Sequence, residues 1–103
     1  MSTNPCERVV LAPETLGLES RSEFRQRAVA LLEEMPEGLG RLVVDLSNTH
    51  HVDSAGLGVL MLVQRRASER RQMVALRKAS EEVRFLLVLT RLHDLFEIEE
   101  HTR

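Results

Sequence analysis

The order of apolar segments along the 103-residue chain predicts a single α/β domain. Short apolar runs bounded by turn residues alternate with longer segments at helical spacing, which favours at least partly parallel strands. The run 42–46 is apolar at nearly every position, as expected of a strand buried on both faces. Because this length leaves little room for a second core, we expect one domain over residues 1–103. Its sheet is expected to be mixed, with four to five strands and three to four helices.

The first strand is predicted at 9–12, a short apolar run that Pro13 ends. The preceding residues, 1–8, are polar, and we expect them to be flexible. Residues 14–19 carry no periodic pattern, which indicates a connector between this strand and the next element.

The first helix is predicted over 20–35. Ser20 and Glu23 form the S-x-x-E pattern of a capping box, which marks a helix start. Pro36 and Gly38 mark its end, since proline cannot continue a helix. The apolar stripe of this helix, spaced to lie on one face, comprises Phe24, Ala28, Leu31, Leu32 and Met35.

The second strand, 42–47, leads through a loop at 48–53 into a helix predicted over 54–71. Asp53 and Ser54 are both good N-cap residues, and either can begin this helix. If Asp53 is the cap, Ser54 occupies the first helical position and its hydroxyl can face solvent.

Two glycines, Gly56 and Gly58, fall in the first turns of this helix. Each costs up to about 1 kcal/mol relative to alanine in a helix interior, and less near a helix end. Together with Ala55 they leave the helix start bare, so another backbone can approach closely. That backbone belongs either to a neighbouring strand of the same domain or to a partner protein.

The C-terminal third predicts a strand at 73–76, a helix and a last strand at 95–99. Ser80 is the expected cap of this helix, and Glu81 and Glu82 suit the positive end of its dipole. The apolar residues of the helix are Val83, Leu86, Leu87, Val88 and Leu89.

Charge and composition exclude several classes of function. The formal net charge of −2 gives no bulk attraction to nucleic acid or to an acidic membrane. The single cysteine, Cys6, excludes an internal disulfide and fits a reducing compartment. Since the sequence shows no signal-peptide pattern and no apolar run long enough to span a bilayer, we expect a cytoplasmic protein.

Ser54 is a candidate modification site on physical grounds. A helix N-terminus carries positive partial charge and free N–H groups, so a phosphate is well tolerated there. A phosphoserine adds about −1.5 to −2 charges at neutral pH, and at this position it need not break the fold. The same pattern also fits a serine that does no more than begin a helix.

An enzymatic reading of the same segment has little support. Ser54, Asp53 and either His50 or His51 suggest a nucleophilic triad, but neighbours on one short loop rarely reach triad geometry. The G-x-S-x-G elbow is absent from the sequence. Adjacent histidines usually point apart, and the glycine pair lacks the rest of a nucleotide fingerprint. We therefore expect no catalytic residue, no metal and no cofactor.

The segment VVDLSNTHHVDSAGLGVL, residues 43–60, resembles the central part of STAS domains. This fold is shared by anti-sigma factor antagonists and the cytoplasmic tails of sulfate transporters, and its pattern is an apolar strand, a short loop, Asp-Ser-small-Gly and a helix. The stretch VRFLLVLTRLHDLFEI, residues 83–98, resembles the last helix and strand of the family. With the helix at 20–35, the resemblance covers about residues 9–99.

The resemblance implies a phosphorylation-switched binding module. In the anti-sigma factor antagonist branch, the serine after the aspartate is phosphorylated, which corresponds to Ser54 beside Asp53 here. The unmodified protein binds an anti-sigma factor, often itself a serine kinase, and frees the sigma factor for transcription. A phosphatase resets the switch. The helix cap and partner surface would comprise Asp53, Ala55, Gly56, Gly58, Thr49, His50 and His51.

One departure from the family concerns the N-terminus. The family usually opens with two strands before the first helix, and only 9–12 is predicted here. We therefore expect a shortened N-terminal strand region with an exposed sheet edge. Either a second copy in a homodimer covers this edge, or the protein belongs to a divergent branch of the family. The alternative function is a non-switching STAS scaffold, or an accessory subunit of a signalling or membrane transport complex.

Overall fold

The computed structural model describes residues 6–99. Of the helices in this range, none combines the length and the apolarity that crossing a bilayer requires. The elements in chain order are β1 (Glu7–Leu11), β2 (Thr15–Leu16), α1 (Arg21–Glu34), β3 (Arg41–Asp45), β4 (His51–Val52), α2 (Ser54–Glu69), β5 (Met73–Arg77), α3 (Glu81–Leu89), a 3₁₀ turn η1 (Leu92–Asp94) and β6 (Glu97–Ile98).

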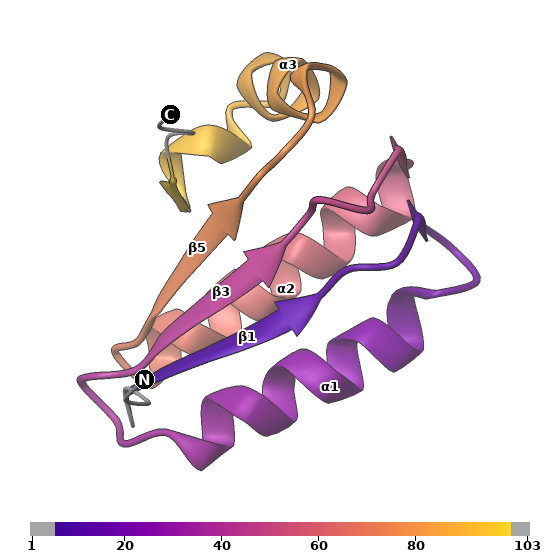
Figure 1. Ribbon diagram of the computed structural model, residues 1–103. Coiled ribbons are helices and arrows are strands. Elements are labelled where there is room, and N and C mark those ends of the chain that lie inside the picture. Colours follow the sequence, from indigo (N-terminus) through magenta and orange to yellow (C-terminus); the bar gives the residue numbers. More distant parts are fainter. Residues whose placement is uncertain (1–5, 100–103) are drawn as a thin grey trace.

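The main sheet has the strand order β1-β3-β5-β6, and each neighbouring pair is parallel (Figure 1). The helices α1, α2 and α3 are the crossovers that parallel pairing requires. The α/β class, a four-stranded sheet and three helices are confirmed. A mixed sheet was expected, but the four described strands of the main sheet are all parallel. They are parallel because a helix connects each strand to the strand beside it in the sheet.

The hydrophobic core lies between the sheet and the pair α1 and α2, which run side by side (Figure 1). In β3, Leu42, Val43 and Val44 are fully buried, which confirms a strand covered on both faces. The predicted stripe of α1 is also found in the core, with Leu31 packed against its margin and the other members buried: Phe24, Ala28, Leu32 and Met35.

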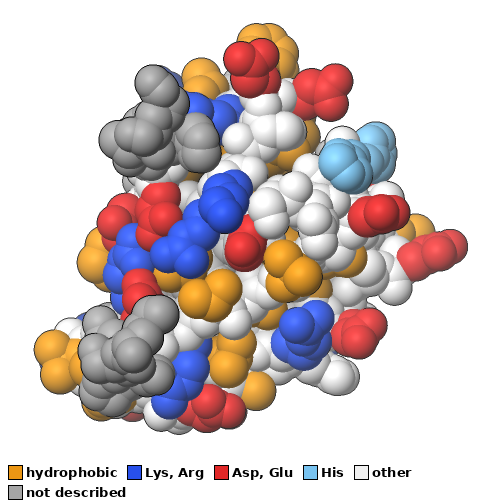
Figure 2. Space-filling model, in the orientation of Figure 1, with side chains coloured by type: hydrophobic (Ala, Val, Ile, Leu, Met, Phe, Trp, Pro, Cys, Tyr) orange, Lys and Arg blue, Asp and Glu red, His pale blue; other side chains and the backbone are white. Residues whose placement is uncertain are grey.

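A network of ion pairs lies on the face of the main sheet opposite the core, which is the face in front of α2 in Figure 1. Arg41 of β3 pairs with Glu7 of β1, with Glu97 of β6 at 3.0 Å and with Glu99 at 2.6 Å. Arg77 of β5 contacts Glu99 at 2.8 Å. Hydrogen bonds from the side chains of Arg77, the larger contribution, and of Arg41 lower the pKa of Glu99 to about 2. Figure 2 shows acidic and basic side chains gathered beside apolar ones on this face.

The N-terminal expectation needs one correction. Glu7 and Arg8, expected in a flexible segment over 1–8, begin β1. They are held there because the Arg41 N–H donates to the Cys6 carbonyl at 2.8 Å and the Arg41 side chain pairs with Glu7. Residues 1–5 of that segment lie outside the described part of the chain.

The connector at 14–19 and the loop at 48–53 are more ordered than expected. Each contains a two-residue strand, and β2 and β4 pair in parallel through Thr15 with His51 and Leu16 with Val52. Segments this short carry no hydrophobic period that sequence reasoning can detect. This small sheet fixes the loop that precedes α2.

The capping box at the start of α1 is not formed. The helix begins after Ser20 as predicted, but the Ser20 side chain makes no cap hydrogen bond. Its Oγ instead donates to the Thr15 carbonyl at 2.7 Å and accepts from the Gly17 N–H at 3.1 Å. The hydroxyl therefore stabilises the turn after β2, not the helix end.

Candidate functional site

Asp53 anchors the start of α2. Its Oδ1 accepts a hydrogen bond from the Gly56 N–H at 2.9 Å, which makes Asp53 the N-cap. Its Oδ2 accepts a longer bond, 3.4 Å, from the Leu18 N–H. The Gly56 N–H is the main reason that the pKa of Asp53 lies below its ordinary value. The carboxylate thus joins α2 to the segment that leads into α1.

Ser54 is the first residue of α2, and its side chain is exposed. The first turn of α2 contains no acidic residue, whereas the first turn of α3 carries Glu81 and Glu82. The positive end of the α2 dipole is therefore balanced by the Asp53 cap carboxylate and not by an acid of the first turn. A phosphate at Ser54 would be attracted by that dipole and repelled by the neighbouring Asp53 carboxylate.

The two glycines of α2 have different surroundings. A Cβ added to Gly56 would lie 1.9 Å from the Leu16 carbonyl oxygen, so Gly56 lets the helix approach β2 closely. A Cβ added to Gly58 would meet nothing within 4 Å. At Gly56, the backbone that approaches the helix start therefore belongs to β2 of the same domain.

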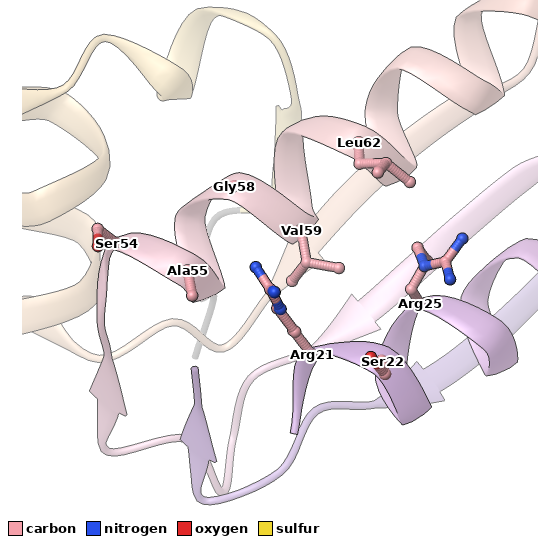
Figure 3. Close-up of a pocket in the computed structure, with 8 residues that line it drawn as sticks. All are labelled: Arg21, Ser22, Arg25, Ser54, Ala55, Gly58, Val59 and Leu62. Carbon is pink, nitrogen blue, oxygen red and sulfur yellow. The ribbon is translucent and has the colours of Figure 1, made fainter. Parts of the chain in front are cut away.

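A groove of about 580 Å³ runs between the N-terminal halves of α1 and α2 (Figure 3). Figure 3 shows Arg21 projecting from α1 toward α2, while Ser54 stands at the far end of the α2 wall. The α1 wall consists of Arg21, Ser22 and Arg25, and the α2 wall of Ser54, Ala55, Gly58, Val59 and Leu62.

Two expected surface residues are buried. Thr49 is 1% exposed, and its Oγ1 donates a hydrogen bond to the Pro13 carbonyl at 2.8 Å. Gly56 is buried against β2. We therefore correct the expected partner surface by removing both, because their contacts lie within the domain.

His50 and His51 are exposed, and their backbone N–H groups donate to the Glu14 carbonyl at 2.9 and 3.2 Å. Both side chains border a smaller depression against α3. Asp53 uses its carboxylate oxygens for backbone N–H groups, so it does not orient a histidine as a triad requires. Within residues 6–99, no three metal-ligating side chains are grouped to hold an ion.

Two surface features were missed by sequence reasoning. Arg21 and Arg25 line the groove beside Ser54, but on the polar face of an amphipathic helix they look like any solvated arginines. The outer face of α3 is the second, because Phe85 and Leu89 are 67% and 66% exposed. Both border the depression at the two histidines.

The fold and the groove together define a small α/β domain with an exposed serine at the start of a helix. A family model described as "Mlab, STAS domain" matches residues 4–97 of the chain. The chain therefore belongs to the STAS domain family, and the resemblance read from the sequence is confirmed.

Known relatives agree with this assignment. A STAS-domain containing protein of Pseudomonas aeruginosa is 38% identical over 58 residues, which span 56% of this chain and 57% of that protein's length. A crystal structure of a Thermotoga maritima protein, provisionally assigned as an anti-sigma factor antagonist, has a TM-score of 0.75 and 26% identity. It covers 90% of this chain and 80% of its own.

The unphosphorylated form of the anti-sigma factor antagonist SpoIIAA has a similar fold. Its TM-score is 0.71 at 11% identity, over 99% of this chain and 86% of that one. At this level of identity the likeness concerns the fold alone.

Proposed function

We propose that the protein is a phosphorylation-switched binding module that acts as an anti-sigma factor antagonist. In its unmodified form it binds an anti-sigma factor that is also a serine kinase. That kinase phosphorylates Ser54 and releases the module, and a phosphatase restores it. The module has no catalytic activity of its own, and it acts in the cytoplasm on the transcription machinery.

The observation that carries this proposal is the position of Ser54. The residue is exposed at the first position of α2, in a first turn without acids, while Asp53 caps the helix from the inside. A phosphate on Ser54 would therefore meet N–H groups and solvent, not a packed interior. The surface can change its charge while the fold stays intact.

The relatives support the same role. The Thermotoga maritima protein, at 26% identity, is provisionally assigned to this class, whereas SpoIIAA, at 11% identity, supports the fold alone. We transfer the phosphorylation site to Ser54 because the Asp53-Ser54 pair lies at the helix start that the family pattern places after its central strand.

The test compares wild-type protein with Ser54→Ala and Ser54→Asp. Each is incubated with ATP and the anti-sigma factor encoded in the same genome, and phosphate on Ser54 is located by mass spectrometry. We expect phosphate on the wild type alone, with stable binding by the alanine variant and weak binding by the aspartate variant. Equal binding by all three proteins would overturn the proposal.

The alternative is a non-switching STAS subunit, a scaffold or an accessory of a signalling or membrane transport complex. The match to the family model described as "Mlab, STAS domain" keeps this alternative open, since that description mentions no sigma-factor regulation. The alternative predicts an unmodified Ser54 under every growth condition. Mass spectrometry of the protein from its native cell separates the two roles.

A further inference from the structure

Ion pairs connect α1 and α2 near their C-terminal ends. Arg66 of α2 faces Glu33 of α1 at 4.0 Å. Just beyond the helices, Arg70, the C-cap residue of α2, faces Glu37 in the turn after α1 at 3.6 Å. Arginines at the C-terminal end of the pair thus have acidic partners across the helix interface.

The N-terminal end of the same pair has arginines without such partners. Arg21 and Arg25 lie one helical turn apart on α1 and are exposed. Within residues 6–99, neither enters an ion pair. The α2 wall opposite them carries no acid, and it consists of Ser54, Ala55, Gly58, Val59 and Leu62.

The groove between these walls suits an amphipathic segment. Leu62 is 41% exposed, and Gly58 leaves open space where a side chain would stand. Apolar side chains of a third helix fit between two packed helices, which is a common mode of peptide recognition. Carboxylates spaced four residues apart on that helix match the spacing of Arg21 and Arg25.

We propose that this groove receives an acidic, amphipathic helix of the protein partner, whose carboxylates pair with Arg21 and Arg25. The inference deepens the proposed function, because it gives the switch a physical cause. A phosphate on Ser54 adds about −1.5 to −2 charges at one end of the groove. It repels the carboxylates of a helix that docks in the same groove.

The test uses a short helical peptide as the probe. Its glutamates lie at positions i and i+4 beside a leucine stripe, and a second peptide carries glutamine in their place. Binding to the unmodified full chain is followed by NMR shifts of backbone amides. We expect the glutamate peptide to shift the amide signals of Arg21, Ala55, Gly58 and their neighbours. The glutamine peptide should bind at least about tenfold more weakly than the glutamate peptide.

The chain offers a matched control on the same helix. Arg25→Glu should weaken glutamate-peptide binding about tenfold or more, whereas Arg27→Glu should not, since Arg27 lines a different depression. Thermal melts establish that both variants are folded, and Arg21→Gln repeats the test without charge reversal. Equal effects of Arg25→Glu and Arg27→Glu, or shifts outside the groove, would overturn the inference.

The peptide assay needs no kinase. If Ser54 is never phosphorylated in the cell, the switch fails while peptide binding in the groove persists. If the peptide does not bind in the groove while phosphate is found on Ser54, the groove inference fails and the switch stands.

Discussion

The first turns of α2 present two faces that differ in their surroundings. On the inner face, Asp53 binds the Gly56 N–H, and Gly56 approaches the Leu16 carbonyl too closely for any side chain. On the outer face, Ser54 is exposed and Gly58 has open space around it. One short segment thus stabilises the fold through its inner face and leaves its outer face available for modification and binding.

Replacing Gly56 by alanine should give the largest effect. The added Cβ would lie 1.9 Å from the Leu16 carbonyl oxygen, a backbone atom that cannot move without displacing β2. Overpacking of this kind typically costs 1–3 kcal/mol, and we expect about 3 kcal/mol here. Urea denaturation measures the loss. A change below about 0.5 kcal/mol would show that the inner face is not tightly packed.

Removal of the Asp53 cap should have the next largest effect. In Asp53→Ala, the N–H groups of Gly56 and Leu18 both lose an acceptor, so stability should fall by less than in Gly56→Ala and by more than in Ser80→Ala. Ser80→Ala is the control, because Ser80 caps α3 through one bond, from the Val83 N–H at 3.2 Å. If Ser80→Ala lowers the free energy of unfolding more than Asp53→Ala does, the Asp53 carboxylate is not what stabilises the inner face.

On the outer face, Gly58→Ala should act in the opposite direction. The new methyl group meets nothing within 4 Å, and alanine is the better helix former by up to about 1 kcal/mol. We expect a stability gain of about 0.5 kcal/mol by chemical denaturation. Destabilisation similar to that of Gly56→Ala would erase the distinction between the two faces.

The smallest effect is the pH dependence of the cap. The folded-state pKa of Asp53 lies below its ordinary value of 3.8, chiefly through the Gly56 N–H. This contribution to stability is therefore present above pH 3.8 and is lost as the pH falls through the folded-state pKa. Asp53→Asn keeps an acceptor that does not titrate.

The stability of wild-type protein relative to Asp53→Asn should accordingly fall below about pH 4. Melting curves of both proteins between neutral and acidic pH measure this difference. A difference that does not change with pH would mean that the charge of Asp53 has no part in the cap.

The long periodic elements could be predicted from the sequence, because α1, α2, β3 and β5 bury patterned apolar faces. The two-residue strands β2 and β4 could not, since pairing between distant segments alone defines them. Thr49 was placed on the surface because its bond to the Pro13 carbonyl depends on that pairing.

At the site, sequence reasoning identified the Asp53-Ser54 start of α2 but left the cap undecided between the two residues. The structure assigns it to Asp53 through the bond to the Gly56 N–H. The groove was out of reach of the sequence, because Arg21 and Arg25 come beside α2 only through the packing of α1.

A phosphate on Ser54 should change binding without changing the fold. The direct measurement compares fully phosphorylated and unmodified protein in denaturant unfolding and in titration with the anti-sigma factor. We expect unfolding free energies within about 0.5 kcal/mol of each other and an affinity about a hundredfold lower for the phosphoprotein, or about 3 kcal/mol. Equal affinities, or loss of the fold on phosphorylation, would show that Ser54 is not a switch of this kind.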